Sequence, residues 1–265
     1  MTELLSDKQW WDFYQQGYLH LGRLLDDSGL AALRERIDEI MLGKVRYEKM
    51  LMQLDGGGAY ADLPEQSKGF KGARLDYRKI QDLEQDSRYL TYMQRPLFKE
   101  ICARSYGAHV PVACYRAMFM NKPARKGTIL PWHQDGGEGW GLDRDPLVTV
   151  WTALDPATQA NGCVQVIPGS HKLGLLSKQG HTITAEQERR HCPGEKIVYL
   201  ELAAGEVVLL HNWLLHRSDV NKTDNPRRGF SVCYMDARTR VLKDGLTFPT
   251  VFGEGALQPR ELQLA

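Results

Sequence analysis

The chain has 265 residues, 42% of them hydrophobic, and its 34 basic and 33 acidic residues leave a formal net charge of +1. This balance gives no electrostatic reason to expect nucleic acid or an anionic membrane as a partner. The N-terminus lacks the basic start and apolar run of a secretory signal, and no segment approaches the roughly 20 apolar residues of a membrane-spanning helix. We therefore expect one cytoplasmic domain over residues 1–265, as a monomer or homodimer.

The five cysteines argue against a cysteine-built scaffold. Their number is odd, and no two of them have CxxC spacing, so neither a disulfide framework nor a zinc ribbon is expected: Cys102, Cys114, Cys163, Cys192 and Cys233. Free thiols in a reducing compartment are the simplest interpretation.

Residues 1–110 are predicted to be mainly helical. Ser6 and Gln9 fit a capping box at the start of a first helix. Ser28 is expected to cap a second helix, whose apolar residues recur at helical spacing, and Pro96 to begin a further one.

Residues 111–237 change to short β-rich runs separated by turn clusters. The runs are VACYRAMFM, LVTVWTAL, CVQVIP, IVYLEL, EVVLLH and FSVCYM. Six or more short strands without intervening helices predict a sandwich or barrel, not a βαβ sheet. The polar stretch 173–196 and the tail 238–265 are candidate lids over such a barrel.

One motif in this β-rich part points to a metal. His133 and Asp135, which flank Gln134, are two residues apart and would point to the same face of a strand. A second histidine from a distant strand would complete the two-histidine, one-carboxylate triad of non-heme Fe(II) oxygenases, which leaves positions open for other ligands.

Two histidines compete for this third position in GEVVLLHNWLLHRSD. His216 is preferred because Ser218 shares its face and Arg227 opens the next β run. His211 is then interpreted as a supporting or core histidine.

A 2-oxo acid and O2 would fill the three open positions of such an iron site. The distal carboxylate of 2-oxoglutarate then needs a buried cation, and an arginine matches a carboxylate bidentately. A serine hydroxyl such as that of Ser218 can donate to the same group. Position alone does not choose between Arg227 and Arg228.

Residues 118–236 resemble the phytanoyl-CoA dioxygenase family of Fe(II)/2-oxoglutarate-dependent oxygenases. The matching segments are MFMNKP, WHQD, VTVWTALDPATQANGCVQVIPGSHK and GEVVLLHNWLLHRSDVNKTDNPRR, and YLHLGRLLDDSGLAALRERID resembles the family's opening helices. The resemblance implies a mainly β, double-stranded β-helix (jelly-roll, cupin-like) core at 111–237, with helices of 1–110 packed outside and 238–265 as a tail.

The resemblance also assigns roles to residues. It implies that His133, Asp135 and His216 bind the metal, and that Arg227, assisted by Ser218, binds 2-oxoglutarate. With less support it implies that Gln134 and Trp151 line the cofactor pocket. The family's halogenating relatives lack the carboxylate present here as Asp135, so hydroxylation, or another oxidation at a C–H bond such as desaturation, of a small-molecule metabolite is expected.

The residues expected to contact that substrate are mostly aromatic: Tyr115, Trp132, Glu138 and Trp140. Several aromatic side chains with one acid would suit an apolar or cationic metabolite, or would be core packing. Two alternatives stay open, namely a cupin-like metal enzyme that does not use 2-oxoglutarate and a non-catalytic jelly-roll binding protein. The pair Ser218 and Arg227 argues against the first, and the intact triad against the second.

Overall fold

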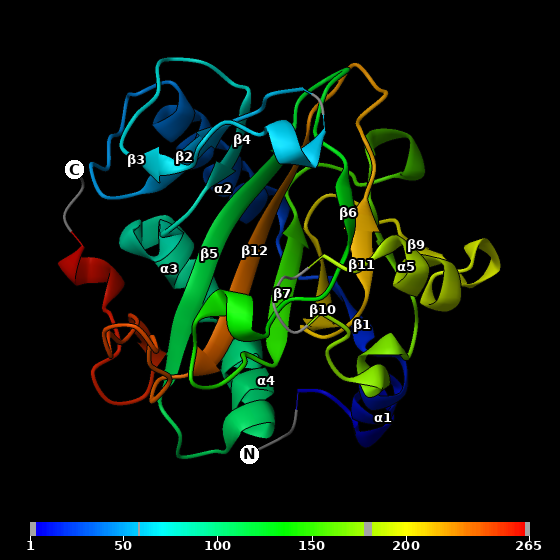
Figure 1. The fold of residues 1–265 in the computed structure, drawn as a ribbon. Helices are drawn as coiled ribbons and strands as arrows, with labels where there is room; N and C mark the ends of the chain where they lie inside the picture. The colour runs from blue at the N-terminus through cyan, green and yellow to red at the C-terminus, as the bar shows by residue number, and fades with distance from the viewer. Residues whose placement is uncertain (1–3, 58, 178–181, 263–265) are drawn as a thin grey trace.

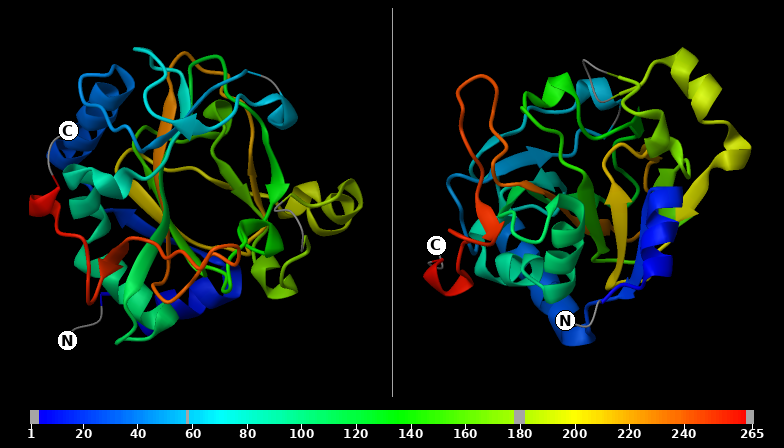
Figure 2. Two further views of the ribbon diagram at one scale, coloured as in Figure 1. Left: turned by 60° about the vertical axis from the view of Figure 1, so that its left-hand side comes forward. Right: turned by 90° about the horizontal axis from the view of Figure 1, so that it is seen from below.

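The computed structural model describes residues 4–57, 59–177 and 182–262. Two antiparallel sheets face each other across the interior (Figures 1 and 2). This arrangement confirms the predicted jelly-roll core. No helix among these residues is long and apolar enough to cross a membrane.

The larger sheet has nine strands, and its central strands are those predicted from the β-rich runs. Its order is β1-β10-β7-β12-β5-β4-β2-β3, with β13 paired to β5. The strands are β1 (Tyr18–Arg23), β2 (Leu51–Leu54), β3 (Ser67–Lys68), β4 (Tyr77–Ile80), β5 (Val112–Lys122), β7 (Val148–Ala153), β10 (Glu206–His211), β12 (Arg227–Asp236) and β13 (Thr250–Phe252).

The smaller sheet has four strands in the order β6-β11-β8-β9. They are β6 (Leu130–His133), β8 (Val164–Val166), β9 (Val198–Leu200) and β11 (His216–Ser218). This sheet contains both of the segments in which the sequence predicts metal ligands.

Helices cover the outer face of the larger sheet (Figure 1). They are α2 (Asp27–Met41), α3 (Ser87–Met93) and α4 (Pro96–Tyr106), whose buried faces join one core cluster with β5, β7, β10 and β12. Two other helices lie elsewhere, α1 (Asp7–Gln16) beside β1 and α5 (Ala185–His191) after β8. The helices thus bury the outer face of the sheet and leave its inner face to line the site.

The predicted helix starts are confirmed in two cases of three. The Ser6 and Gln9 side chains form the capping box of α1, and Pro96 is the first residue of α4. The prediction for Ser28 is wrong, because Asp26 caps α2 by accepting a hydrogen bond from the Gly29 N–H. An aspartate caps a helix as well as a serine does, and here it stands two residues earlier.

The part before residue 111 is less helical than expected, since β1 to β4 also lie there. The segment YLHLGR, interpreted from the family resemblance as part of the opening helices, forms β1 and pairs with β10. Gly22 allows this strand to bulge, because it adopts a φ of 75° where the register shifts.

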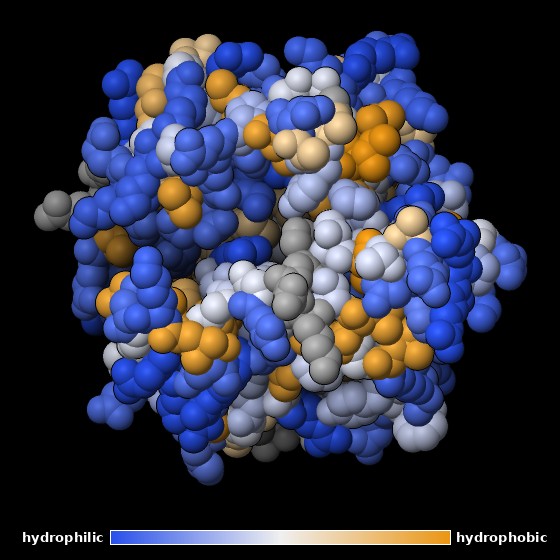
Figure 3. Space-filling view, viewed as in Figure 1, coloured by the Kyte–Doolittle hydropathy of each residue, from blue (hydrophilic) through white to orange (hydrophobic). Residues whose placement is uncertain are grey.

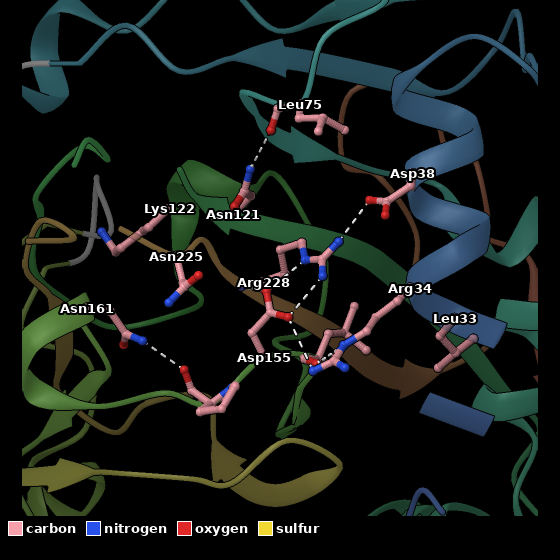
Figure 4. Close-up of polar contacts among 12 residues, drawn as sticks. Leu33, Arg34, Asp38, Leu75, Asn121, Lys122, Asp155, Asn161, Asn225 and Arg228 are labelled. Atoms are coloured by element: carbon pink, nitrogen blue, oxygen red, sulfur yellow. Dashed lines mark hydrogen bonds and ion pairs between the residues drawn. The ribbon is translucent and has the colours of Figure 1, made fainter. Parts of the chain in front are cut away.

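An ion-pair network joins α2 to the N-terminal end of β12 (Figure 4). The Arg228 guanidinium donates to both Asp155 carboxylate oxygens, at 2.7 and 3.0 Å, and to Asp38 on α2 at 2.8 Å. Arg34 on α2 lies 3.3 Å from Asp155 as well. Arg228 therefore faces the helices and not the interior between the sheets.

Both candidate lids are partly fixed to the barrel. In the tail, β13 pairs with β5, and the Gln94 amide donates to the carbonyls of Val251 and Leu257. In the stretch 173–196, α5 follows Thr182, which forms a bridge with His133, while positions 178–181 lie outside the described residues. The second segment thus contacts the metal-ligand strand directly.

One buried acid should make folding sensitive to pH. Burial, and then the nearby Asp82 carboxylate, raises the pKa of Glu84 from 4.5 to about 8. The folded protein keeps a proton that the unfolded chain releases, so this contribution to the free energy of unfolding is present below pH 4.5 and declines through pH 8. Between these two pH values the free energy of unfolding falls by roughly 1.4 kcal/mol per pH unit. Glu84→Gln should remove it and leave the variant more stable than the parent at high pH.

Urea unfolding at about pH 5 and about pH 9 measures this effect. The exposed Glu65 provides the control, because Glu65→Gln changes the same functional group without burial. Equal pH dependence in the parent and Glu84→Gln would contradict the expected pKa.

Candidate functional site

The three predicted metal ligands meet at one point of the barrel. β6 ends at His133, and the register of the smaller sheet places His216 on β11 directly opposite it. Asp135 lies just beyond β6, where its N–H donates to the Asn212 carbonyl at 2.8 Å. One ligand atom from each side chain lies within 4.8 Å of the other two. The His216 Nε2 and an Asp135 carboxylate oxygen are 3.9 Å apart.

The hydrogen bonds of the two imidazoles fit a metal ion. Nδ1 of His133 lies 2.8 Å from the Pro131 carbonyl, and Nδ1 of His216 lies 2.9 Å from the Leu214 carbonyl. Since a carbonyl only accepts, each Nδ1 carries the proton and each Nε2 the lone pair. A backbone hydrogen bond of this kind orients the imidazole of a typical metal-binding histidine. Two such nitrogens and a carboxylate are a donor set suited to Fe(II).

His211 lies near this group and is not part of it. Its Nδ1 accepts a hydrogen bond from the Trp213 N–H at 3.1 Å, and its ring centroid is 4.9 Å from that of His171. Burial, and then His171, lowers the pKa of His211 to about 4. His211 is thus a neutral imidazole that is hydrogen-bonded to the backbone. This agrees with its interpretation as a supporting histidine and not a metal ligand.

Arg227 is a buried cation at the other end of the interior. Its side chain is 2% exposed, its Nη2 donates to the Gly162 carbonyl at 2.8 Å, and its guanidinium lies 5.6 Å from the Trp151 ring. Within the described parts of the chain its Nε has no hydrogen-bond partner and no carboxylate pairs with it. Burial lowers its pKa to about 10, so it remains charged at neutral pH. An unpaired buried cation of this kind needs an anion.

Arg227 and Arg228, which sequence position alone does not separate, thus have different surroundings. Arg228 points to the helices and is neutralised by Asp155 and Asp38 (Figure 4). Arg227 lines the cleft that also contains the triad.

Ser218 and Trp151 lie beside Arg227 in this cleft. Ser218 follows His216 by two residues on β11 and is buried, and the Trp151 indole is buried on β7. Gly229 on β12 makes room for the indole, because a Cβ at that position would lie 2.4 Å from the ring. Gly229 could not be identified from the sequence, because its contact with a tryptophan on a neighbouring strand leaves no pattern along the chain.

The cleft between the sheets encloses about 830 Å³ of empty space, including its open mouth. Its mouth lies on the face shown in Figure 3, which is hollowed near its centre and hydrophilic there. Four residues with cationic side chains directed to the interior are among the described residues that line it: Arg78, Lys79, Arg116 and Arg227. Arg217 also contributes to the lining, but its guanidinium lies 5.1 Å from the Trp132 ring on the other face of the smaller sheet. Asp135 is the only acid in that lining. Burial, followed by Arg116 and Arg78, lowers the pKa of Lys79 to about 7.

Two residues expected in the pocket face away from it. The Gln134 amide donates to the carbonyls of Gly174 and Trp213 and accepts from the Leu176 N–H, so it fixes the loop after β8. Trp132 packs in a separate cluster on the outer side of the smaller sheet. Strand alternation explains both placements, since residues adjacent to His133 point to the opposite face.

Three more residues expected to contact substrate do not line the cleft. Glu138 is exposed, which removes the acid on which a preference for a cationic metabolite rested. Tyr115 and Trp140 stack on each other at 4.7 Å and lie 4.6 Å from the Arg116 guanidinium. They therefore hold Arg116, which does line the cleft.

The cleft residues missed by the sequence analysis are mainly Arg78, Lys79 and Arg116. Arg116 shares a strand face with Met118 and Met120, a spacing that the sequence shows, although nothing in the sequence tells which face of β5 is inward. Arg78 and Lys79 lie on β4, a strand that was not predicted.

Comparison with known proteins places this site in a family. The family model described as phytanoyl-CoA dioxygenase (PhyH) matches residues 13–229. A probable phytanoyl-CoA dioxygenase of Caenorhabditis elegans is 26% identical, over 87% of this chain and 75% of its own length. The peroxisomal phytanoyl-CoA dioxygenase of Homo sapiens is 25% identical, over 85% of this chain and 67% of its own length.

Among solved structures, the fold is similar to SnoK, a non-heme alpha-ketoglutarate-dependent carbocyclase from nogalamycin biosynthesis. The TM-score is 0.66 at 22% identity, and the match covers 92% of this chain and 90% of SnoK. This likeness supports the jelly-roll fold, while the family model covers both histidine segments and Arg227. The chain belongs to the phytanoyl-CoA dioxygenase family of Fe(II)/2-oxoglutarate-dependent oxygenases.

Proposed function

We propose that His133, Asp135 and His216 hold Fe(II), and that Arg227 with Ser218 binds the distal carboxylate of 2-oxoglutarate. The observation that carries this proposal is that one cleft contains both a triad of suitable donors and a buried arginine without a carboxylate partner among the described residues. A cupin-like enzyme that does not use 2-oxoglutarate would have no need for the unpaired buried arginine.

The reaction we propose is hydroxylation of a small molecule. A substrate C–H bond, O2 and 2-oxoglutarate give C–OH, succinate and CO2. The bound iron supplies the activation of O2, and the chain's own residues supply position and polarity. Because Asp135 fills the third protein position of the metal site, the place that a halide would need is taken, which favours hydroxylation.

The residues around the triad have separate tasks in this proposal. The Pro131 and Leu214 carbonyls keep the two imidazoles in the tautomer that binds a metal. Arg227 fixes one end of 2-oxoglutarate, so that its oxo acid end is directed along the cleft to the metal. The Trp151 indole contributes an aromatic wall of the cleft next to Arg227.

We also propose a cytoplasmic location and a monomeric or homodimeric state. All five cysteines are free and buried, as suits a reducing compartment. The relative from Homo sapiens is designated peroxisomal, and a fluorescent fusion in the source cell distinguishes the two locations.

Conversion of 2-oxoglutarate tests the proposed activity. Protein freed of metal by a chelator should not release succinate, and Fe(II) with O2 should restore release, even slowly without the primary substrate. Asp135→Ala should reduce the rate by at least about a hundredfold, because one of three protein ligands is lost. Oxygen consumption that is independent of 2-oxoglutarate would instead support the cupin-like alternative.

A further inference from the structure

Arg116 lies at the end of the cleft opposite the proposed co-substrate anchor. On β5, Arg116, Met118 and Met120 line the cleft at two-residue spacing. The register with β12 places Lys122 opposite Arg227 and Arg116 opposite Cys233. These positions are six residues apart along β5, and a strand rises by about 3.3 Å per residue, so roughly 20 Å separate them along the strand. Arg116 therefore lies beyond the reach of a co-substrate bound at Arg227.

Hydrogen bonds connect Asp135 of the metal triad to the Arg116 end of the larger sheet. At the level of Arg116, the larger sheet pairs Cys233 with Thr149, and the Thr149 hydroxyl bonds to Asn212 at 2.8 Å. Asn212 in turn accepts from the backbone of Asp135. The side of the metal site toward Asp135 thus faces the Arg116 end of the cleft.

Aromatic side chains fix the Arg116 guanidinium in place. It lies 4.6 Å from both the Tyr115 and Trp140 rings, and its Nη2 donates to the Tyr115 hydroxyl at 3.1 Å. Phe248 from the tail packs edge-on against Tyr115 at 5.4 Å. A guanidinium whose faces lie against rings still presents its N–H edge, and less side-chain entropy is lost when that edge binds an anion.

The cations of the cleft form no ion pair within the described part of the chain. Among the described ion pairs, none includes Arg78, Lys79, Arg116 or Arg227. The side-chain partner of Arg78 is neutral, since Arg78 donates to the Gln53 amide oxygen. The distal carboxylate of 2-oxoglutarate neutralises one cation, while Asp135 and the C1 carboxylate of 2-oxoglutarate together balance the charge of Fe(II). A surplus of positive charge remains on the substrate side.

We propose that the primary substrate is a small anion, whose carboxylate or phosphoryl group binds Arg116 while its oxidisable C–H bond lies at the metal centre. This proposal rests on the proposed function, because it assigns the substrate of that site. It replaces the apolar or cationic metabolite expected from sequence. The methionines of β5 provide the apolar surface that the carbon chain of such a substrate would cover.

Matched probes test the preference for an anion. Short linear carboxylates, alkylphosphonates and primary amides of equal chain length are added to the anaerobic protein with Fe(II) and 2-oxoglutarate, and binding is measured by calorimetry. The parent should bind the anions about 10- to 100-fold more tightly than the amides, the range expected for hydrogen bonds to a charged group. Comparing carboxylates with phosphonates identifies which anion the site takes.

Arg116→Gln should abolish this preference and leave the affinity for 2-oxoglutarate unchanged. Arg144→Gln is the control, since Arg144 is half-exposed and pairs with Asp236 at 3.3 Å outside the cleft. Unchanged anion preference in Arg116→Gln, equal binding of amides by the parent, or weakened 2-oxoglutarate binding in the variant would each overturn the proposal.

A different result would contradict the proposed function, namely that the parent does not bind 2-oxoglutarate. In that case, the same anions are titrated into the Fe(II) protein alone. A preference that Arg116→Gln removes and Arg144→Gln retains would then support the anion site even though the co-substrate assignment is wrong. Loss of the preference in both variants, or in neither, would overturn it.

Discussion

His216→Ala should abolish Fe(II) binding, whereas His211→Ala should leave it nearly intact. His216 contributes one of three donor atoms that lie within 4.8 Å of one another. Removing a supporting hydrogen bond around a metal typically costs 10- to 100-fold in affinity, and removing a ligand should cost more. His211 has its Nδ1 on the Trp213 N–H, and its loss should chiefly affect packing.

Anaerobic titration with Fe(II), followed by metal analysis after desalting, measures this difference. Circular dichroism of both variants establishes that they are folded, which matters because His211 is packed against His171 and Phe13. If His211→Ala loses iron and His216→Ala retains it, the ligand assignment is wrong.

Arg227→Ala should weaken 2-oxoglutarate binding by about two to three orders of magnitude and leave Fe(II) in place. Truncating one partner of a buried charge pair costs roughly 2–5 kcal/mol. The effect on iron should be small because Arg227 lies on β12, and all three ligands belong to β6, the residues just after it, and β11. Calorimetric titration of 2-oxoglutarate into the anaerobic Fe(II) protein gives the affinity.

Arg228→Ala is the matched control for this variant. It removes the neighbouring guanidinium, which pairs with Asp155 and Asp38, and should lower the free energy of unfolding. The folded fraction should bind 2-oxoglutarate with the parent's affinity. Weaker binding in Arg228→Ala than in Arg227→Ala would reverse the assignment of the two arginines.

The part of the fold predicted best from sequence is the β-rich half. Each of the six runs contains a strand of the structure. Short apolar runs bounded by turns are too short for most helices and are typical of buried strands. The strands before residue 111 were missed for a physical reason. β3 and β4 have two and four residues and depend on pairing with distant strands, which leaves little periodicity along the chain.

The candidate site divides in the same way. His133, Asp135, His216 and Ser218 were predictable because their spacing within short segments reflects the geometry of two neighbouring strands, β6 and β11. Arg227 was separated from Arg228 only by the family resemblance, because it lies on β12 in the other sheet. The residues on the substrate side of the cleft were not predictable from the sequence. Tyr115 and Trp140 are aromatic residues near the metal motif, yet they support Arg116, a contact that depends on the tertiary arrangement of three segments.

The measurement that tests the central claim most directly is the visible spectrum of the anaerobic protein with Fe(II) and 2-oxoglutarate. A 2-oxo acid that chelates iron held by His133, Asp135 and His216 should produce a weak metal-to-ligand charge-transfer band. At the same concentration of 2-oxoglutarate, the band should be absent from His216→Ala and weaker in Arg227→Ala. Absence of the band in the parent, with tight Fe(II) binding confirmed, would contradict the account.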